Sequence, residues 1–458
     1  MTTLPFHEVF AQQQAYFRAG RTLHVNERRQ ALITLQAAIR RMEQPIMQAL
    51  QQDLGKSQGE AYMTEVGVVL DEVRMAIKHV RRWAKPRKVR TALTHVGSRG
   101  MIVPEPYGCT LIISPWNYPF QLAIAPLIGA IAAGNTAILK PSELTPHTSA
   151  CLAKLIRDTF DPQHVTVIEG GAETSQQLTA LPFDHIFFTG SVAIGKIIMQ
   201  AAAKRLTPVT LELGGKSPCV VHADADIRLA AKRIAFGKWT NAGQTCVAPD
   251  YIYVHRSRYD ELIHELERAV QQFFGEDPLN SGEYASIVSK RHFERLATFM
   301  DNGAIAFGGS SDATTRRMSP TVLTDVTWEM PVMQEEIFGP ILPVLTYDSF
   351  EEVERAIIER PKPLALYLFT NDRQLEQHVI SRISFGGGCI NDTLMHFATP
   401  YLPFGGVGES GIGRYHGHFS FQAFSHEKSV LRQTTWFDFS FRYPGSKHRF
   451  QLMRKLFK

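Results

Sequence analysis

The chain has 458 residues, of which 44% are hydrophobic and 20% are charged, proportions typical of a globular protein with two or three domains. Its five cysteines are scattered and form no Cys-x-x-Cys pair, which argues against a disulfide framework or a zinc site and for a reducing compartment. The net charge of +5 belongs to the lysines and arginines of residues 447–458. Because the rest of the chain is neutral, a nucleic-acid-binding face is not expected.

The chain shows no targeting or membrane signal. Its first residues contain neither the basic nor the apolar segment of an export signal. No run reaches the ~20 apolar residues that a membrane span needs. We therefore expect a cytoplasmic protein without a transmembrane segment.

The N-terminal part predicts helices. Apolar residues recur at a three-to-four spacing over residues 32–42, after a cap-like Asn26. Pro45 suits the first turn of a second helix, and Gly55 suits its end. A third helical pattern spans about residues 61–83.

Residues 85–90 predict an exit loop, and residues 91–104 predict a strand pair with a turn at 97–100. From residue 107 to 212, short apolar runs alternate with helical patterns, which is typical of a βαβ series in a parallel sheet. The expected strands are 110–114, 136–139, 165–168, 185–188 and 209–211, and the expected helices are 119–133, 146–159, 172–180 and 192–204. Ligands of such sheets bind at the carboxyl ends of the strands.

The remainder predicts a second α/β unit over residues 213–418 and a return strand within 419–434. A formal Gly-x-Gly-x-x-Gly match at residues 406–411 follows a Pro-Phe-Gly turn and not a strand. We interpret it as a loop without a phosphate-binding role.

Cys246 and Glu212 give the clearest chemical signal. Cys246 ends the run Asn-Ala-Gly-Gln-Thr-Cys, and Glu212 lies upstream in Leu-Glu-Leu-Gly-Gly. A thiol is a strong nucleophile, and a carboxylate can activate water to release what the thiol captures. A buried structural cysteine is the commoner role of a free thiol. The polar, glycine-containing surroundings favour a reactive thiol here.

Two further motifs follow expected strands. Asn117 lies between two prolines, so its amide is held in place and can stabilise an oxyanion, although a turn role is the usual one for such an asparagine. Lys140 and Glu143 end the next strand, where a carboxylate can accept hydrogen bonds from a ribose. A solvated charge pair at a helix start would give the same pattern.

Two more motifs are weaker when taken alone. Gly190 and Gly195 flank Ser191 at the start of a helix, whose N-terminus attracts a pyrophosphate, but the middle glycine of the dinucleotide fingerprint is absent. Further along, Glu336 offers a contact for a second ribose, and Phe338 offers a flat ring contact.

Together these motifs resemble the aldehyde dehydrogenase family. The matching segments occur in family order across roughly residues 60–430: Pro115-Trp-Asn-Tyr-Pro, Lys140-Pro-Ser-Glu, Phe188-Thr-Gly-Ser, Leu211-Glu-Leu-Gly-Gly-Lys-Ser-Pro, Gly243-Gln-Thr-Cys, Glu335-Glu-Ile-Phe-Gly-Pro and Pro403-Phe-Gly-Gly-Val-Gly. Within the family the chain is similar to the class 3 branch, through segments such as Cys246-Val-Ala-Pro-Asp-Tyr and Tyr415-His-Gly.

The resemblance implies an α/β fold with two Rossmann-type parallel-sheet domains and a small bridging β element. It assigns residues 1–87 and 107–212 to a dinucleotide-binding domain and residues 213–418 to a catalytic domain. The bridging element, residues 88–106 and 419–434, is expected to join two subunits across a two-fold axis in a homodimer.

The resemblance also implies the chemistry. The Cys246 thiolate would attack an aldehyde, while Asn117 and the Cys246 backbone amide hold the oxyanion. Glu212 would then activate the water that hydrolyses the thioester to a carboxylate. Glu336 is a second candidate for this base; we favour Glu212, because its glycine-flanked loop faces the thiol in the family fold.

NAD is the expected cofactor, with NADP tolerated. Glu143 should disfavour a 2′-phosphate by like charge, whereas class 3 members often accept both cofactors. The resemblance places at the cofactor Trp116, Lys140, Glu143, Gly190, Ser191, Gly195, Leu213, Gly214, Glu336 and Phe338.

The expected substrate is a hydrophobic aldehyde, either aromatic or medium-to-long-chain aliphatic. Residues that could line its channel, each equally suited to the core or an interface, are Tyr62, Tyr118, Trp239, Leu394 and His416. Two alternatives remain: a CoA-acylating aldehyde dehydrogenase or thiol acyltransferase, which Glu212 disfavours, and a non-catalytic protein of the same fold.

Residues 435–458 predict a basic tail with a short helix. Phe450, Met453 and Phe457 share one face of this helix, opposite the basic side chains. We favour a helix that docks over the body or over the neighbouring subunit. A weak peripheral contact with anionic membranes is the alternative.

Overall fold

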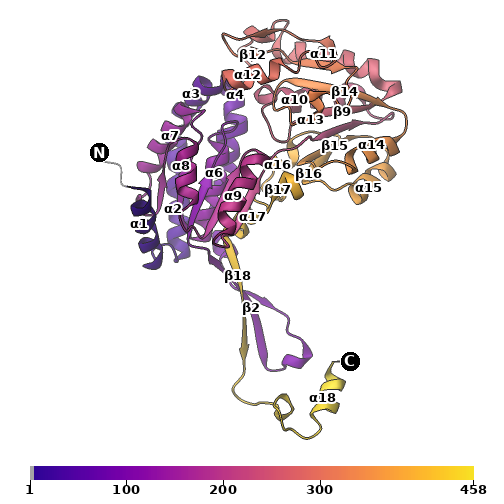
Figure 1. Cartoon of the computed structure of the whole chain (residues 1–458). Helices are drawn as coiled ribbons and strands as arrows, with labels where there is room; N and C mark the ends of the chain where they lie inside the picture. The colour runs from indigo at the N-terminus through magenta and orange to yellow at the C-terminus, as the bar shows by residue number, and fades with distance from the viewer. Residues whose placement is uncertain (1–4, 458) are drawn as a thin grey trace.

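The computed structural model describes residues 5–457, so the expectations for residues 1–4 and Lys458 lie outside the described residues. The chain folds into two α/β lobes, from which a narrow arm of strands and the C-terminal segment project (Figure 1). Each lobe contains a largely parallel sheet. The predicted fold class, two Rossmann-type sheets with a small bridging β element, is confirmed.

A run of helices opens the first lobe. These are α1 (Phe6–Arg18), α2 (Val25–Arg41), α3 (Glu43–Leu54), α4 (Gln58–Ala61), a π-helix (Tyr62–Val66) and α5 (Gly67–Trp83). Gly55 ends α3 with a φ of 68°, as predicted. Asn26 does not cap α2, because the helix begins at Val25 and its N-cap is His24. The helix expected over residues 61–83 is interrupted by the π-helical turn, which the spacing of apolar residues does not reveal.

The sheet of the first lobe has the order β17-β7-β6-β3-β4-β5. Its parallel strands are β3 (Cys109–Ile113), β4 (Thr136–Lys140), β5 (Val165–Val167), β6 (His185–Thr189) and β7 (Val209–Glu212), connected by α6 (Gln121–Ala133), α7 (Pro146–Arg157), α8 (Ala172–Thr179) and α9 (Val192–Ala203). Each lies within two residues of the predicted span. The short β17 (Gly411–Ile412) joins antiparallel beside β7. Every residue of α6 is buried, because the helix packs between α2, α5 and the sheet.

The sheet of the second lobe has the order β10-β13-β14-β9-β8-β15-β16. Its strands are β8 (Pro218–Val221), β9 (Tyr251–His255), β10 (Ala304–Phe307), β13 (Thr321–Thr324), β14 (Ile341–Tyr347), β15 (Ala365–Phe369) and β16 (Gly387–Ile390). Only the edge strand β10 is antiparallel to its neighbour within the described part of this sheet. The helices are α10 (Ile227–Trp239), α11 (Tyr259–Phe274), α12 (Lys290–Ala297), α13 (Pro331–Gln334), α14 (Phe350–Ile358), α15 (Arg373–Arg382) and α16 (Met395–Ala398), and β11 (Ser311–Asp312) pairs with β12 (Arg317–Met318).

The arm is an antiparallel sheet of β1 (Arg87–Val89), β2 (Ser98–Pro106) and β18 (Ser425–Gln433). The strand pair expected within residues 91–104 is wrong: β1 lies in the predicted exit loop, and a 3-10 turn (Leu93–His95) precedes β2. The predicted return strand begins as the helix α17 (His418–Ala423), because the buried Phe421 packs against Trp83 of α5.

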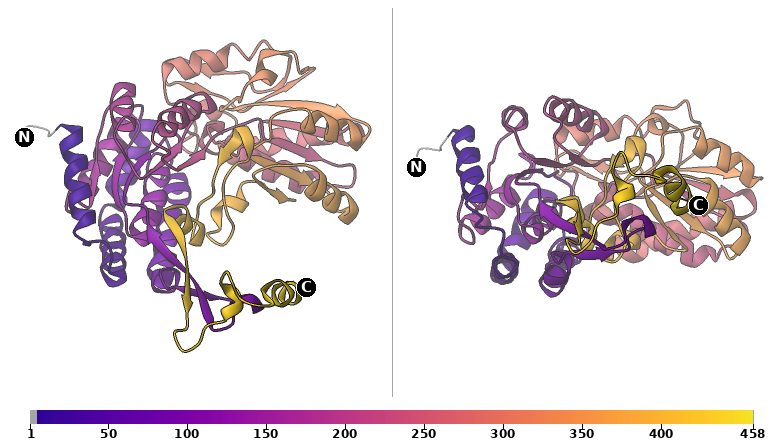
Figure 2. Two further views of the ribbon diagram at one scale, coloured as in Figure 1. Left: turned by 60° about the horizontal axis from the view of Figure 1, so that its bottom comes forward. Right: turned by 90° about the horizontal axis from the view of Figure 1, so that it is seen from below.

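The C-terminal segment continues beyond the arm. Its last helix, α18 (Arg449–Leu456), lies away from both lobes (Figure 2). The short helix predicted in the tail is therefore confirmed. Within residues 5–457 it does not pack on either lobe of its own chain (Figure 2). No helix in residues 5–457 is long and apolar enough to cross a membrane.

Candidate active site

Residues from both lobes meet at the candidate active site. Asn117 follows β3 and Glu212 ends β7, so both stand at carboxyl ends of parallel strands, where ligands of such sheets bind. Cys246 comes from the second lobe, between a 3-10 turn (Thr240–Gly243) and β9. The structure brings the three together: the Asn117 side-chain amide donates to the Gln244 carbonyl at 3.0 Å, and Glu212 acts electrostatically on Cys246.

Desolvation dominates the electrostatics of the three acidic groups at the site. Burial raises the pKa of the Cys246 thiol, and the nearby carboxylates of Glu336 and Glu212 raise it further. Burial likewise raises the pKa of Glu212 well above its ordinary value, and neither of its carboxylate oxygens has a hydrogen-bond partner among the described residues. Burial is also the main cause that raises the pKa of Glu336 to about 8. The three groups therefore compete for negative charge in one low-dielectric site.

Backbone groups partly offset this effect at Cys246. The backbone N–H groups of Cys246 and Val247 lower the pKa of the thiol. Such donors favour negative charge at the sulfur and at an oxygen beside it. The site therefore contains a nucleophile, backbone donors and two candidate bases.

The loop before Cys246 is held in an uncommon conformation. Asn241 and Ala242 take φ angles of 55° and 50°, which L-residues other than glycine rarely adopt. Gly243 also has positive φ, and a Cβ there would lie 2.2 Å from the Gly339 carbonyl oxygen. The Gln244 side chain fixes this loop, donating to the Asn241 carbonyl at 3.0 Å and accepting from a backbone N–H at 2.9 Å. Tertiary contacts thus hold a strained turn beside the nucleophile.

The predicted cofactor residues of the first lobe line up along the ends of its strands. At the end of β4, the Lys140 amine lies 3.0 Å from the Glu143 carboxylate. Ser191 caps α9 by accepting from the Ile194 N–H. A Cβ on Gly195 would lie 2.6 Å from the Leu213 side chain, so Gly195 allows close helix–loop packing.

Two further predicted cofactor residues line a cavity of about 500 Å³ between the lobes. Gly214 and Glu336 line it, together with Val192 at the start of α9. A Cβ on Gly214 would meet the Glu336 carboxylate at 2.0 Å, so a larger residue there would displace the Glu336 side chain. Trp116 and Phe338 meet edge to face, with ring centroids 5.2 Å apart. A cavity lined by the start of α9 and by the half-buried Glu336 carboxylate has the polar groups that an extended dinucleotide needs.

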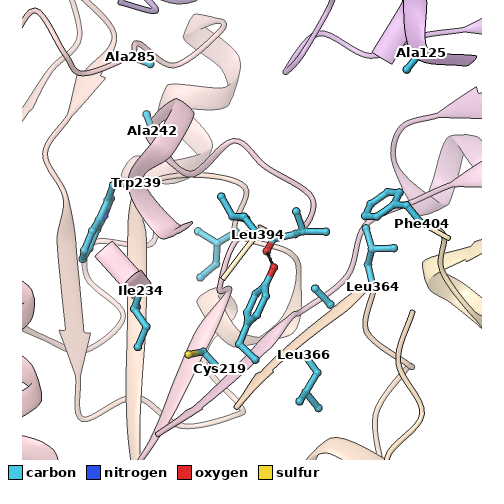
Figure 3. Close-up of a cluster of buried hydrophobic side chains, with 14 of the residues drawn as sticks. Ala125, Cys219, Ile234, Trp239, Ala242, Ala285, Leu364, Leu366, Leu394 and Phe404 are labelled. Carbon is cyan, nitrogen blue, oxygen red and sulfur yellow. Dashed lines mark hydrogen bonds between the residues drawn. The ribbon is translucent and has the colours of Figure 1, made fainter. Parts of the chain in front are cut away.

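The predicted channel residues separate into two groups. Tyr62 is half exposed on the π-helix, and the Tyr118 hydroxyl pairs with Thr245, next to Cys246, at 2.6 Å. Trp239 and Leu394 belong to a buried hydrophobic cluster (Figure 3), in which the Trp239 indole donates to the Pro340 carbonyl at 2.9 Å.

The last predicted channel residue, His416, is also buried. Its ring stacks on Tyr415 at 4.2 Å between centroids, and its Nδ1 lies 3.6 Å from the Glu72 carboxylate. The structure thus places Tyr118 closest to the nucleophile loop and puts Trp239 and Leu394 in the core.

Sequence reasoning missed three buried charged residues. Lys56 and Glu65 form an ion pair that contacts Asn117, and Lys238 precedes the Cys246 loop. The Lys238 amine has no hydrogen-bond partner within residues 5–457, and burial lowers its pKa to about 8. Lys238 lies four residues after Ile234 on the apolar face of α10, and this position was the available signal.

Known proteins resemble the chain over nearly its whole length. A model of the aldehyde dehydrogenase family matches residues 5–430. The chain is 50% identical to the 4,4'-diaponeurosporen-aldehyde dehydrogenase of Staphylococcus aureus over 98% of both chains. It is 46% identical to the "aldehyde dehydrogenase, dimeric NADP-preferring" of Rattus norvegicus, covering 91% of this chain and 92% of that protein. A solved structure, the substrate-bound state of Staphylococcus aureus AldH, superposes with a TM-score of 0.98 at 49% identity over 100% of both chains.

Removing the Glu336 charge should make the Cys246 thiol more acidic. Glu336 is ionised above about pH 8 and then raises the thiol pKa. In Glu336→Gln, the pH profile of Cys246 alkylation by iodoacetamide should therefore shift about one unit toward lower pH. Glu335→Gln, at an exposed carboxylate paired with Arg295, is the control and should leave the profile in place. An unchanged profile in Glu336→Gln would contradict the charge competition.

Proposed function

The chain belongs to the aldehyde dehydrogenase family, and from this we propose that it oxidises a hydrophobic aldehyde, aromatic or medium-to-long-chain aliphatic, to the carboxylate, with NAD preferred and NADP tolerated. The observation that carries the proposal is the half-buried thiol of Cys246, flanked by the buried, unpartnered carboxylate of Glu212 and by the amide of Asn117. A nucleophile, a base and an oxyanion donor are the groups that acyl transfer through a thioester needs.

The first step is attack of the Cys246 sulfur on the aldehyde carbon. The thiol proton passes to Glu212, so the pair carries one negative charge before and after the transfer. Burial raises the pKa of both groups. The difference between the two pKa values, and not either value alone, therefore determines how easily the thiolate forms.

The oxygen of the attacked carbonyl becomes an oxyanion. The Cys246 backbone N–H and the Asn117 amide are placed to hold it. One Asn117 N–H is already used by the Gln244 carbonyl. That bond orients the amide and leaves its second N–H for the oxyanion.

Residues at the strand ends would hold the dinucleotide. Lys140 and Glu143 would contact the adenosine ribose, and the α9 N-terminus would face the pyrophosphate. Glu336 would contact the second ribose, and Trp116 and Phe338 would flank the nicotinamide region. When bound, the nicotinamide supplies the hydride acceptor of the oxidation. This assignment makes residues 1–87 and 107–212 the dinucleotide-binding domain and residues 213–418 the catalytic domain.

Oxidation of the adduct leaves a thioester on Cys246. Glu212 releases the thiol proton to solvent and then accepts a proton from a water, whose oxygen attacks the thioester carbon and expels the Cys246 thiolate; the carboxylic acid so formed loses its proton to solvent and leaves as the carboxylate. Its unpaired oxygens are free to bind that water. Glu336 is less suited to act as this base, because it lies beside Gly214 in the cavity that would hold the cofactor.

The hydrophobic substrate class is supported by the surroundings of Cys246 and by a relative. The Tyr118 hydroxyl pairs with the Thr245 hydroxyl at 2.6 Å and the Tyr367 hydroxyl donates to the Val247 carbonyl at 2.5 Å, so a phenol group contacts the residue on each side of Cys246. The name of the Staphylococcus aureus relative specifies 4,4'-diaponeurosporen-aldehyde. Aromatic walls and a half-exposed Tyr62 suit an apolar chain better than a charged one.

Glu212→Gln should slow release of the product more than its formation, because the base is needed once the thioester exists. In stopped flow at alkaline pH, where solvent can also accept the thiol proton, we expect a burst of about one NADH per site and a steady state roughly 100-fold slower than in the wild type. Cys246→Ala is the blank and should give neither phase. A burst in Glu336→Gln but not in Glu212→Gln would reassign the base to Glu336.

A kinetic panel tests the substrate class. With hexanal, decanal, benzaldehyde and coniferaldehyde, kcat/KM should exceed that for acetaldehyde by at least about tenfold, since buried methylene groups and rings add binding energy. The panel is run with NAD and with NADP, and NAD should give the higher kcat/KM. Added CoA should not accelerate turnover. Equal kcat/KM for acetaldehyde and decanal would contradict a hydrophobic site.

We also propose a homodimer joined through the arm, in a reducing compartment such as the cytoplasm, which the five free cysteines support. Residues 98–106 and 425–433 pair within one chain, and the sheet order leaves the outer edge of β18 open to a second copy. Beyond it, Trp436, Phe450 and Phe457 are 94%, 76% and 73% exposed in the single chain. Such apolar exposure fits a tail that docks on the neighbouring subunit.

Light scattering of the full chain should give a dimer at micromolar concentration, and a variant ending at Thr434 should dimerise about tenfold more weakly because it loses apolar contact area. A monomeric full chain would contradict the arm interface. Sedimentation with anionic vesicles at low salt covers the alternative role of the basic tail. If only the full chain pellets, the tail contacts membranes and not the second subunit.

A further inference from the structure

Lys56 and Glu65 form an ion pair in the interior of the first lobe. Both side chains are 0% exposed, and the Lys56 Nζ lies 2.6 Å from a Glu65 carboxylate oxygen. Burying two charges carries a large desolvation penalty, so a pair of this kind is weak evidence for stability. The reason for burying this pair therefore lies in the groups that it contacts and not in a gain of stability.

Each partner of the pair binds the backbone around Asn117. The Lys56 Nζ donates to the Asn117 carbonyl at 3.0 Å. The second oxygen of Glu65 accepts from the Phe120 and Gln121 N–H groups at 3.1 and 2.8 Å. These N–H groups begin α6, whose preceding residue provides no side-chain cap. Glu65 acts as the cap, and a carboxylate suits this end of the helix dipole.

The Asn117 carbonyl also contacts the nucleophile loop. It accepts a second hydrogen bond from the Asn241 side-chain amide at 2.8 Å, and the same amide donates to the Gln244 carbonyl at 3.2 Å. Both acceptor positions of the Asn117 carbonyl are thus used. The peptide plane that follows Asn117 is fixed from both lobes.

The π-helix explains how Glu65 reaches this place. Thr64, Glu65 and Val66 are buried, whereas Tyr62 and Met63 on the same turn are exposed. A π-turn inserts an extra residue into the helix and shifts the following side chains around its axis. The insertion directs Glu65 toward Lys56 while α5 continues along the same helix.

We propose that Lys56 and Glu65 are positioning residues that fix the Asn117 backbone so that its side-chain amide meets the oxyanion. The inference rests on the proposed function, which gives Asn117 the oxyanion role. Neither side chain needs to touch the substrate. Their effect passes through the Asn117 carbonyl and the first turn of α6.

The test is a double-mutant cycle on the single-turnover rate of NADH formation, with active sites counted by Cys246 alkylation. Lys56→Met should lower the rate roughly tenfold or more, with little change in the KM for aldehyde, because misplaced catalytic groups lose rate steeply. Asn117→Ala should lower it roughly 100-fold. In the Asn117→Ala background, Lys56→Met should change the rate by less than about twofold, because there is no amide left to position.

Asp53→Asn is a matched control. Asp53 is also a buried carboxylate that binds the first N–H groups of a helix, accepting from His147 and Thr148 at the start of α7. Like Lys56→Met, this substitution should lower the thermal unfolding temperature. Unlike Lys56→Met, it should leave the single-turnover rate at saturating cofactor unchanged. Equal loss of rate in Asp53→Asn and Lys56→Met would mean that both act through stability, and the positioning role would be overturned.

The remaining outcomes separate the two proposals. A wild-type rate in Asn117→Ala would remove the oxyanion role and the positioning role with it. A slow Asn117→Ala combined with the same fold loss from Lys56→Met in both backgrounds would overturn positioning alone. Where Lys56→Met does not fold, Glu65→Gln, which keeps the side-chain size, takes its place in the same cycle with the same expected result.

Discussion

A carboxylate that is buried without a hydrogen-bond partner among residues 5–457 is the constraint on which the rest of the site depends. Glu212 is buried and Cys246 is half-buried, and desolvation raises the pKa of both. In such a place every nearby donor acts strongly, since little solvent screens it. The same low dielectric makes an unpaired group costly, and Glu212 has no partner for either oxygen within the described chain. Burial of the unpartnered Glu212 carboxylate therefore costs free energy, which the surrounding packing must offset.

Glycine is what allows the backbone to approach these carboxylates. A Cβ on Gly214 would lie 2.0 Å from Glu336, and one on Gly405 would lie 3.2 Å from Glu212. Gly411 pairs with Glu212 across β17 and β7. The glycine-rich loop 406–411 thus packs in part against Glu212, while Glu409 and Ser410 of the same loop line the cavity between the lobes. Its glycines serve close approach of backbone to a buried acid.

The parts predicted well from the sequence are those set by local patterns. The βαβ series of the first lobe was placed within two residues, because alternating apolar runs and helix signals are local. The N-terminal helices were predicted less accurately at the π-turn, which directs Glu65 toward Lys56 and has no signature in the spacing of apolar residues. The arm was placed wrongly over residues 91–104, since β2 pairs with a strand more than 300 residues away.

The candidate site divides in the same way. Cys246, Glu212 and Asn117 stand in short motifs, whereas Lys56 and Glu65 stand in no motif and gain meaning from a carbonyl that lies far along the chain. What joins them is the junction of the lobes. Asn117 belongs to the first lobe and Gln244 to the second, and their hydrogen bond crosses between them. The Lys56–Glu65 pair binds the Asn117 carbonyl from the first lobe, and the Asn241 side chain binds the same carbonyl from the second lobe.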